Sequence, residues 1–316
     1  MKKILTVIAA FALACTLSCK KDTRKVTVFH AGSLAVPMKH LKKSFEKKHP
    51  GIEVLLESSG SRAAARKISD LHKPCDIMAS ADYSVINNLL MPEYASFNIR
   101  FATNEMAIVY TAKSRYADKI NTGNWYKILL KDDVSYGHSD PERDPCGYRS
   151  QLVWQLAEKH YREPGLYEKL RAGCPKKNIR PKEVDLIGLI EAGALDYIFL
   201  YRSVAIQHDL PFVELPPQIS LGDPAYNSFY KKAYVDLTGK KPGQTVRVRG
   251  ESMVYGITMV KNPVNRKDAL SFLAFMLGNE GMDIIKSLGQ GPIMPALTSE
   301  YGSVPEELKK YVKGVR

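Results

Sequence analysis

Residues 24–61, RKVTVFHAGSLAVPMKHLKKSFEKKHPGIEVLLESSGS, decide the fold expected for this chain. The apolar, β-branched run VTVF predicts a buried strand, and after the turn HAGS apolar residues recur at helical spacing at Leu34, Met38, Leu41 and Phe45. HPG ends that helix, and IEVLLE predicts a second strand. RAAARKISDL and CDIMAS then predict a helix and a third strand. This alternation indicates an α/β fold in which helices pack on a parallel sheet.

The alternation continues along the rest of the chain. Further strands are predicted at EMAIVYT (105–111), DVSYGHS (133–139), LDYIFLY (195–201) and VYGITMV (254–260). Helices are predicted at NWYKILL, after DPCGYR, at PKEVDLIGLIEAG with a stop at Gly193, and in RKDALSFLAFMLGNEGMDIIKSLG.

The N-terminus has the layout of an export signal. Lys2 and Lys3 precede an apolar run that is too short to span a bilayer, and small residues then lead to Cys19. We therefore expect a signal peptide over residues 1–18 and acylation of Cys19, with Cys15 as the rival site. The mature chain is expected to be exported and held at the membrane by its lipid, in the periplasm or at the cell surface.

Length and charge narrow the class of protein. The chain of 316 residues exceeds what a single core usually supports, which predicts two domains. Its formal net charge of +13 is spread along the chain and would attract anions at long range. Nucleic-acid binding would need a basic stripe with interleaved aromatic residues, which the sequence does not contain. No CxxC or HExxH pattern supports a zinc site, and Cys146 with Cys174 is the pair that could form a disulfide.

Three strand-to-helix turns, HAGSL, SSGSR and DPCGYR, are candidates for a binding site, because such turns lie at one edge of a parallel sheet. Ser33 and Ser61 are either N-caps or part of an anion site at helix N-termini. On pattern alone Asp144 and Glu183 are predicted to cap helices, with Pro145 at a first helical position.

A series of stretches in order from about residue 26 to 295 resembles the tungstate/molybdate substrate-binding proteins of ABC transporters, the long type best known from archaea. They are HAGSL, SSGSRAAARKI, DIMASADY, FATNEMAIVYT, NWYKILL, DPCGYRS, GALDYIFLYRSVAIQH, ELPPQISLGDP and YGITMVKNPVNRKDALSFLAFMLGNEG. DPCGYR together with DYIFLYRSVAIQH is the specific part. One departure is LRAGCPKKNIRPKEVD, the link before Glu183, which is shorter than the resemblance leads us to expect.

The resemblance implies a two-lobed periplasmic-binding-protein fold of type II. Each lobe would be a mostly parallel sheet flanked by helices, with the ligand in the cleft between the lobes. We expect a first lobe at 26–104 plus 255–316 and a second at 105–254, with EMAIVYT and VYGITMV as the crossovers.

The resemblance also implies which residues contact the oxyanion. They are Gly32, Ser33, Ser61, Asp144, Pro145, Cys146, Glu183 and Tyr201. Asp144 and Glu183 would bond through their carboxylates directly to the metal centre, while hydroxyl and backbone donors hold the oxo groups. Carboxylates repel a dianion such as sulfate or phosphate, whose central atom takes no extra ligand, whereas tungsten(VI) and molybdenum(VI) accept hard oxygen donors.

Two alternatives stay open at this point. The chain could bind another tetrahedral oxyanion such as sulfate or phosphate, or it could be a hydrolase with Cys146 as nucleophile, which requires a base within about 3 Å. The resemblance implies a monomer that docks on an ABC permease, without catalysis or a cofactor. The cationic side chains near the turns are expected to pair with acids at the rim rather than to attract anions; they are Arg62, Arg66, Arg149 and Arg202.

Overall fold

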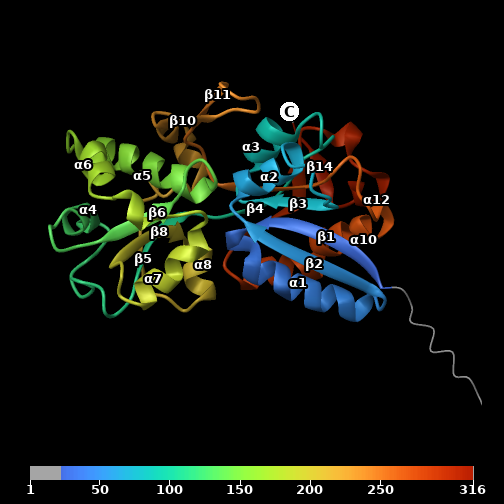
Figure 1. The fold of residues 1–316 in the computed structure, drawn as a ribbon, viewed down its shortest axis with the longest axis horizontal. Coiled ribbons are helices and arrows are strands. Elements are labelled where there is room, and N and C mark those ends of the chain that lie inside the picture. The colour runs from blue at the N-terminus through green and yellow to red at the C-terminus, as the bar shows by residue number, and fades with distance from the viewer. Residues whose placement is uncertain (1–22, 316) are drawn as a thin grey trace, which may run out of the picture.

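The computed structural model describes residues 23–315, which form two sheets that lie side by side, each flanked by helices (Figure 1). The expected signal peptide and both candidate lipidation sites, Cys15 and Cys19, lie outside the described residues. Within residues 23–315, no helix combines the length and the apolar character that a membrane crossing requires. We call the larger sheet with its helices the first lobe and the smaller one with its helices the second lobe.

The first lobe has a seven-stranded sheet in the order β14-β13-β4-β12-β3-β1-β2. Its strands are β1 (Arg24–Ala31), β2 (Ile52–Ser59), β3 (Ile77–Ser80), β4 (Ile99–Thr103), β12 (Val254–Met259), β13 (Gly291–Thr298) and β14 (Val312–Gly314). Its helices include α1 (Ala35–Lys48), α2 (Ser61–Ser69), α3 (Tyr83–Val85), α10 (Arg266–Leu277), α11 (Asn279–Ser287) and α12 (Glu306–Lys309), with short helical turns η1 (Gly32–Leu34), η2 (Ile86–Leu90) and η6 (Tyr301–Ser303).

The second lobe has a five-stranded sheet in the order β7-β6-β8-β5-β9. Its strands are β5 (Met106–Tyr110), β6 (Tyr136–Ser139), β7 (Ile179–Arg180), β8 (Tyr197–Tyr201) and β9 (Phe212–Glu214). Its helices are α4 (Trp125–Leu129), α5 (Pro145–Tyr161), α6 (Leu166–Ala172), α7 (Ile187–Glu191), α8 (Arg202–Gln207) and α9 (Asn227–Tyr230), with turns η3 (Lys176–Asn178), η4 (Glu183–Leu186) and η5 (Pro224–Tyr226).

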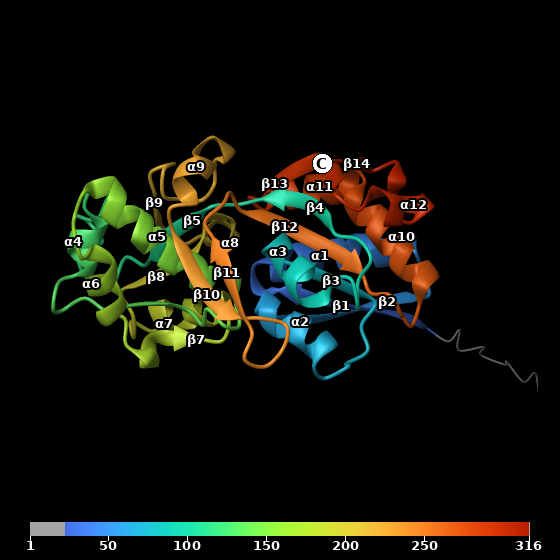
Figure 2. The same ribbon diagram turned by 90° about the horizontal axis from the view of Figure 1, so that it is seen from above.

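A separate hairpin of β10 (Tyr234–Thr238) and β11 (Thr245–Arg249) extends from the second lobe toward α2 of the first lobe (Figure 2). Arg66 on α2 donates to the carbonyl oxygen of Gly239 at 2.9 Å. Lys240 in the hairpin turn pairs with Glu93 of the first lobe at 3.0 Å. The hairpin therefore bridges the two lobes.

The α/β class is confirmed, but both sheets are mixed rather than mostly parallel. In the first lobe β1 pairs in parallel with β2 and β3, whereas β12 runs antiparallel to β3 and β4. In the second lobe β6 pairs in parallel with β7 and β8, whereas β5 runs antiparallel to β8 and β9. The path of the polypeptide explains the mixed sheets. β5 and β12 follow the connections between the lobes, and each runs opposite to the parallel strands of the sheet that it joins.

Apolar spacing explains where the helices lie. α1 buries Met38, Leu41 and Phe45, the predicted stripe, and each such side chain contributes about 1.5–3 kcal/mol when it leaves water. The predicted helix PKEVDLIGLIEAG is instead split into η4 and α7, and its stop at Gly193 is confirmed by a positive φ of 70°.

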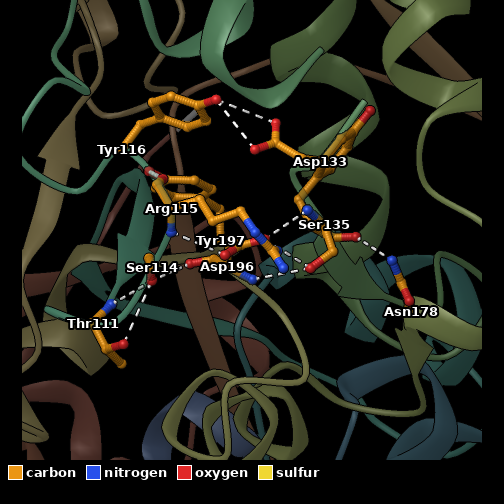
Figure 3. Close-up of polar contacts among 10 residues, drawn as sticks. Thr111, Ser114, Arg115, Tyr116, Asp133, Ser135, Asn178, Asp196 and Tyr197 are labelled. Atoms are coloured by element: carbon orange, nitrogen blue, oxygen red, sulfur yellow. Dashed lines mark hydrogen bonds and ion pairs between the residues drawn. The ribbon is translucent and has the colours of Figure 1, made fainter. Parts of the chain in front are cut away.

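A buried aspartate, Asp196, links the starts of strands β6 and β8 in the second lobe (Figure 3). Asp196, just before β8, accepts hydrogen bonds from the backbone N–H of Ser135 at 2.8 Å and of Arg115 at 3.0 Å. The Ser135 hydroxyl at 3.0 Å and the Arg115 guanidinium at 2.9 Å complete its shell. Asp196 thereby joins the loop after β5 to the start of β6.

Candidate functional site

Turns from both lobes meet where their strands end. From the first lobe come Gly32 and Ser33 in η1, which follows β1, and Ser61 at the start of α2, which follows β2. The second lobe contributes three segments: the turn into α5 with Asp144, Pro145 and Cys146, the start of η4 with Glu183, and the end of β8 with Tyr201. All eight residues predicted to contact the ligand are buried, and carboxyl ends of strands are where open α/β sheets bind ligands.

Asp144 occupies the centre of this meeting point and is 1% exposed. Its Oδ1 accepts from the backbone N–H of Cys146 at 2.9 Å, so the predicted cap of α5 is confirmed, with Pro145 at the start of the helix. Its Oδ2 accepts from the backbone N–H of Glu183 at 2.8 Å. Asp144 thus joins the start of α5 to the start of η4, while burial raises the pKa of its carboxyl.

Glu183 does not cap a helix. Its carboxylate is 1% exposed, and neither oxygen has a hydrogen-bond partner among residues 23–315. Burial, followed by the charge of Asp144, raises its pKa well above the ordinary value. A buried carboxylate without a partner is costly, so this position is built either for a protonated acid or for an electropositive centre beside it.

Gly32 faces Glu183 across the lobes. A Cβ atom added to Gly32 would lie 2.7 Å from Oε2 of Glu183, so the glycine leaves the room in which the carboxylate sits. Gly60, which precedes Ser61, lies against the turn that carries Asp144: an added Cβ would collide with the carbonyl oxygen of Arg143 and would lie 3.0 Å from Cβ of Asp144. The two turns of the first lobe therefore each pack against one of the two acids.

The interpretation of Ser33 and Ser61 as N-caps is wrong. Leu34 and Gly60 occupy the N-cap positions of α1 and α2, and neither N-cap residue caps its helix through a side chain in the described range 23–315. The two hydroxyls bond elsewhere: Ser33 Oγ accepts from the Tyr255 hydroxyl at 3.1 Å, and Ser61 Oγ accepts from the N–H of Ala81 at 3.0 Å. Tertiary partners, which local sequence does not reveal, decide their role.

Cys146 and Cys174, the pair that could have formed a disulfide, are free buried thiols. They contact different strands: Cys146 Sγ donates to the carbonyl oxygen of Phe199 at 3.4 Å, and Cys174 Sγ donates to that of Tyr136 at 3.5 Å. Burial raises the pKa of the Cys146 thiol well above its usual value. A group held as a neutral thiol is a poor nucleophile, which argues against the hydrolase alternative.

Two arginines expected at the rim are instead buried between the lobes. Arg149 on α5 pairs with Asp82 of the first lobe at 3.2 Å and donates to the carbonyl oxygen of Ala81 at 2.8 Å. Arg62 on α2 pairs with Glu142 of the second lobe at 3.2 Å. That these arginines pair with acids was expected. Their burial was not expected, because it results from the contact of one lobe with the other.

The other two arginines pair nearer the surface, as expected. Arg202 lies 3.5 Å from carboxylate oxygens of Glu105 and Glu214, and Arg66 pairs with Asp70 at 3.0 Å. Sequence reasoning missed the polar residues that support the site from behind. Asp82, Tyr148, Asn104 and Tyr255 carry no local signal, since their partners lie far away along the chain.

Residues 26–289 match the family described as bacterial extracellular solute-binding protein. The chain belongs to this family. Among relatives of this solute-binding protein, an uncharacterized solute-binding protein of Petrotoga mobilis is 51% identical over 300 residues, which cover 95% of this chain and 94% of that protein. The molybdate/tungstate-binding protein WtpA of Pyrococcus abyssi is 43% identical over 320 residues, which cover 93% and 91% of the two chains.

Solved structures show the same architecture. The periplasmic molybdate-binding protein of Azotobacter vinelandii superposes with a TM-score of 0.61 at 20% identity, covering 84% of this solute-binding protein and 98% of that chain. The sulfate-binding protein SubI of Mycobacterium tuberculosis superposes with a TM-score of 0.59 at 13% identity, covering 85% and 87%. These likenesses establish the two-lobed fold of type II for the family member described here.

Proposed function

We propose that this solute-binding protein captures tungstate or molybdate between its lobes, outside the cytoplasm, and delivers it to the permease of an ABC transporter. The observation that carries the proposal is the Glu183 carboxylate, which is buried beside Asp144 and has no hydrogen-bond partner among the described residues. The identity with the molybdate/tungstate-binding protein of Pyrococcus abyssi supports the same class of ligand.

Coordination chemistry explains why two acids face each other. Tungsten(VI) and molybdenum(VI) are hard centres that accept oxygen donors beyond their own oxo groups. Glu183 offers both oxygens, and each oxygen of Asp144 accepts one N–H and so keeps a further lone pair. The two carboxylates attract such a centre and repel an anion whose central atom cannot take them.

The oxo groups need donors, which both lobes supply. We propose that the hydroxyls of Ser33, Ser61 and Tyr201 and the backbone N–H of Gly32 donate to them. Pro145, which has no N–H, and Cys146, whose N–H donates to Asp144, would contact the anion without a backbone hydrogen bond to it. The protein would act without catalysis or a cofactor, as a monomer anchored through Cys19. Its lobes would comprise 26–104 plus 255–316 and 105–254.

Calorimetry tests this proposal. Tungstate, molybdate, sulfate and phosphate are each titrated into the chain from residue 23 onward at neutral pH. We expect tight one-to-one binding of the first two anions and none of the others. Glu183→Gln keeps the shape but removes the charge, and we expect it to weaken tungstate at least tenfold, since a hydrogen-bonded or coordinated charge contributes about 1.5–3 kcal/mol.

The alternative ligand class gives a different result. If sulfate or phosphate binds as tightly as tungstate, and Glu183→Gln strengthens that binding by removing a repulsive charge, the protein is a binder of ordinary tetrahedral oxyanions. If Glu183→Gln weakened the binding of all four anions equally, coordination would also be contradicted, because only a metal centre is stabilised by the carboxylate.

A further inference from the structure

Two hydroxyls of the site accept a hydrogen bond from a group that can only donate. The Tyr201 hydroxyl accepts from Nη1 of Arg149 at 3.1 Å, and Ser61 Oγ accepts from the backbone N–H of Ala81 at 3.0 Å. A guanidinium and a peptide N–H have no acceptor role, so the direction of both bonds is determined. Each hydroxyl is therefore left with its own proton to donate.

Ser33 reaches the same state through a longer chain that starts at Asn104. The backbone N–H of Glu105 donates to Oδ1 of Asn104 at 2.9 Å, which sets the orientation of the amide. Its Nδ2 then donates to the Tyr255 hydroxyl at 2.8 Å, and Tyr255 donates to Ser33 Oγ at 3.1 Å. The order of donors along this chain leaves the Ser33 proton for an acceptor outside it.

This series of hydrogen bonds is buried. Tyr255 is fully buried and Asn104 is 8% exposed, and Gln290 Nε2 donates to the Ser33 carbonyl oxygen at 3.2 Å. Asn104 lies between β4 and β5, where the polypeptide first passes between the lobes, and also donates to Ser203 Oγ of the second lobe at 2.7 Å. Among residues 23–315, no acceptor receives the proton of Ser33, Ser61 or Tyr201.

We propose that Asn104 is a positioning residue which, through Tyr255, makes Ser33 a hydrogen-bond donor to an oxo group of the bound anion. This inference rests on the proposed function and adds a residue to it that touches no ligand. An oxyanion without protons offers only hydrogen-bond acceptors, so a site that presents donors binds it. A hydroxyl whose proton pointed elsewhere would present a lone pair to the oxo group and repel it.

Asn104→Asp tests the inference because it keeps the shape of the side chain but replaces the donor Nδ2 with an oxygen that accepts. Four donors would surround the new carboxylate: the N–H groups of Glu105 and Ser203, and the hydroxyls of Ser203 and Tyr255. They stabilise its ionised form, so Tyr255 would donate to residue 104 and accept from Ser33. We expect the Kd for tungstate at pH 8 to rise about tenfold, as for Ser33→Ala, the effect of one lost hydrogen bond to a charged group.

A double-mutant cycle separates the positioning of Ser33 from structural damage at the β4–β5 connection. In a Ser33→Ala background there is no hydroxyl to turn, so Asn104→Asp should change the tungstate Kd by less than twofold. Asn98→Asp is the matched control: this buried amide donates to Tyr83 and Asn87 within the first lobe, and its replacement should leave the Kd unchanged. Independent, additive losses in the cycle would overturn the inference.

Tyr255→Phe provides a second variant that does not introduce a charge. It removes the relay but lets Ser33 rotate and still donate, so the loss should be smaller than for Ser33→Ala and should vanish in that background. A loss equal to or larger than that of Ser33→Ala contradicts the relay. Failure of the unmodified protein to bind tungstate refutes the proposed function, whereas failure of the cycle in a protein that binds refutes only the role of Asn104.

Discussion

At the scale of single residues, the site depends on the Glu183 carboxylate and on Gly32, which has no side chain. Among residues 23–315 the Glu183 carboxylate has no hydrogen-bond partner, and Gly32 leaves the space in which its oxygens lie. Neither residue is informative alone, because glycines in turns and glutamates at helix starts are common. Their contact across the lobes gives both a role.

Gly32→Ala should weaken tungstate binding at least tenfold with little loss of stability. The new Cβ would lie 2.7 Å from Oε2 of Glu183, and the flexible carboxylate would move away from its position. Calorimetry measures the affinity and urea unfolding measures the stability. Gly188→Ala is the matched control, since apart from its neighbours and the backbone of its own helix, no atom of the described residues would lie within 4 Å of the new Cβ.

Unchanged tungstate affinity in Gly32→Ala would show that the position of Glu183 is unimportant for binding. Gly188 lies in α7, where alanine is the better helix former by about 1 kcal/mol, so the control should bind normally and unfold at a slightly higher urea concentration.

At the scale of elements, the ends of strands are held by polar side chains as well as by the sheet. Asp196 receives four donors from Arg115 and Ser135 and so links three segments of the second lobe (Figure 3). It lies before β8, whose far end carries Tyr201. The element that presents a site residue is therefore secured at its opposite end.

Asp196→Ala should lower the free energy of unfolding by about 3 kcal/mol, because it removes the buried acceptor of two part-buried backbone N–H groups, of Ser135 and Arg115, together with the Ser135 hydroxyl bond and the Arg115 ion pair. Urea unfolding followed by circular dichroism measures the change. Asp133→Ala is the control. Within the described part of the chain, the Asp133 carboxylate accepts hydrogen bonds from the Tyr116 hydroxyl alone, at an exposed position, so its loss should cost less than about 0.5 kcal/mol. Equal losses for the two variants would contradict the role given to the Asp196 cluster.

At the scale of the whole molecule, the described residues show the lobes closed on each other. Arg149 with Asp82, Arg62 with Glu142, and the β10–β11 hairpin all bridge the lobes. Closure buries Asp144 and Glu183 together, and this burial raises the pKa of both acids. An open form would return them to water and to ordinary pKa values.

The closed, ligand-free form should therefore be favoured by acid. A group whose pKa is higher in one state binds more protons there, so closure loses stability as pH rises above about 4.3, the ordinary pKa of glutamic acid. We expect small-angle X-ray scattering of the empty protein to show a radius of gyration that increases with pH. Protein saturated with tungstate should stay compact throughout.

Glu183→Gln serves as the control for this effect, since it removes the group whose pKa is shifted most strongly by both burial and Asp144. Its radius of gyration should depend less on pH. A dependence as steep as that of the unmodified protein would assign the effect to other groups.

Most elements could be predicted from the sequence because apolar spacing and turn residues act locally. The stripe Met38, Leu41 and Phe45 and the cap at Asp144 are examples that the structure confirms. The direction of β5 and β12 within their sheets could not be predicted this way, because it depends on the path of the chain between two lobes. The same is true of Cys146 and Cys174, which pack against different strands.

By itself the sequence determined the α/β class, the order of elements and, through its resemblance to a known family, the residues to examine. Only the tertiary structure decided that Ser33 and Ser61 accept tertiary hydrogen bonds rather than cap helices, that Arg149 is buried, and that Glu183 has no partner among the described residues. The physical reason is the distance along the chain over which each interaction acts. Helix and strand propensities act over a few residues, whereas burial, pKa shifts and hydrogen-bond direction depend on groups that meet only when two lobes close.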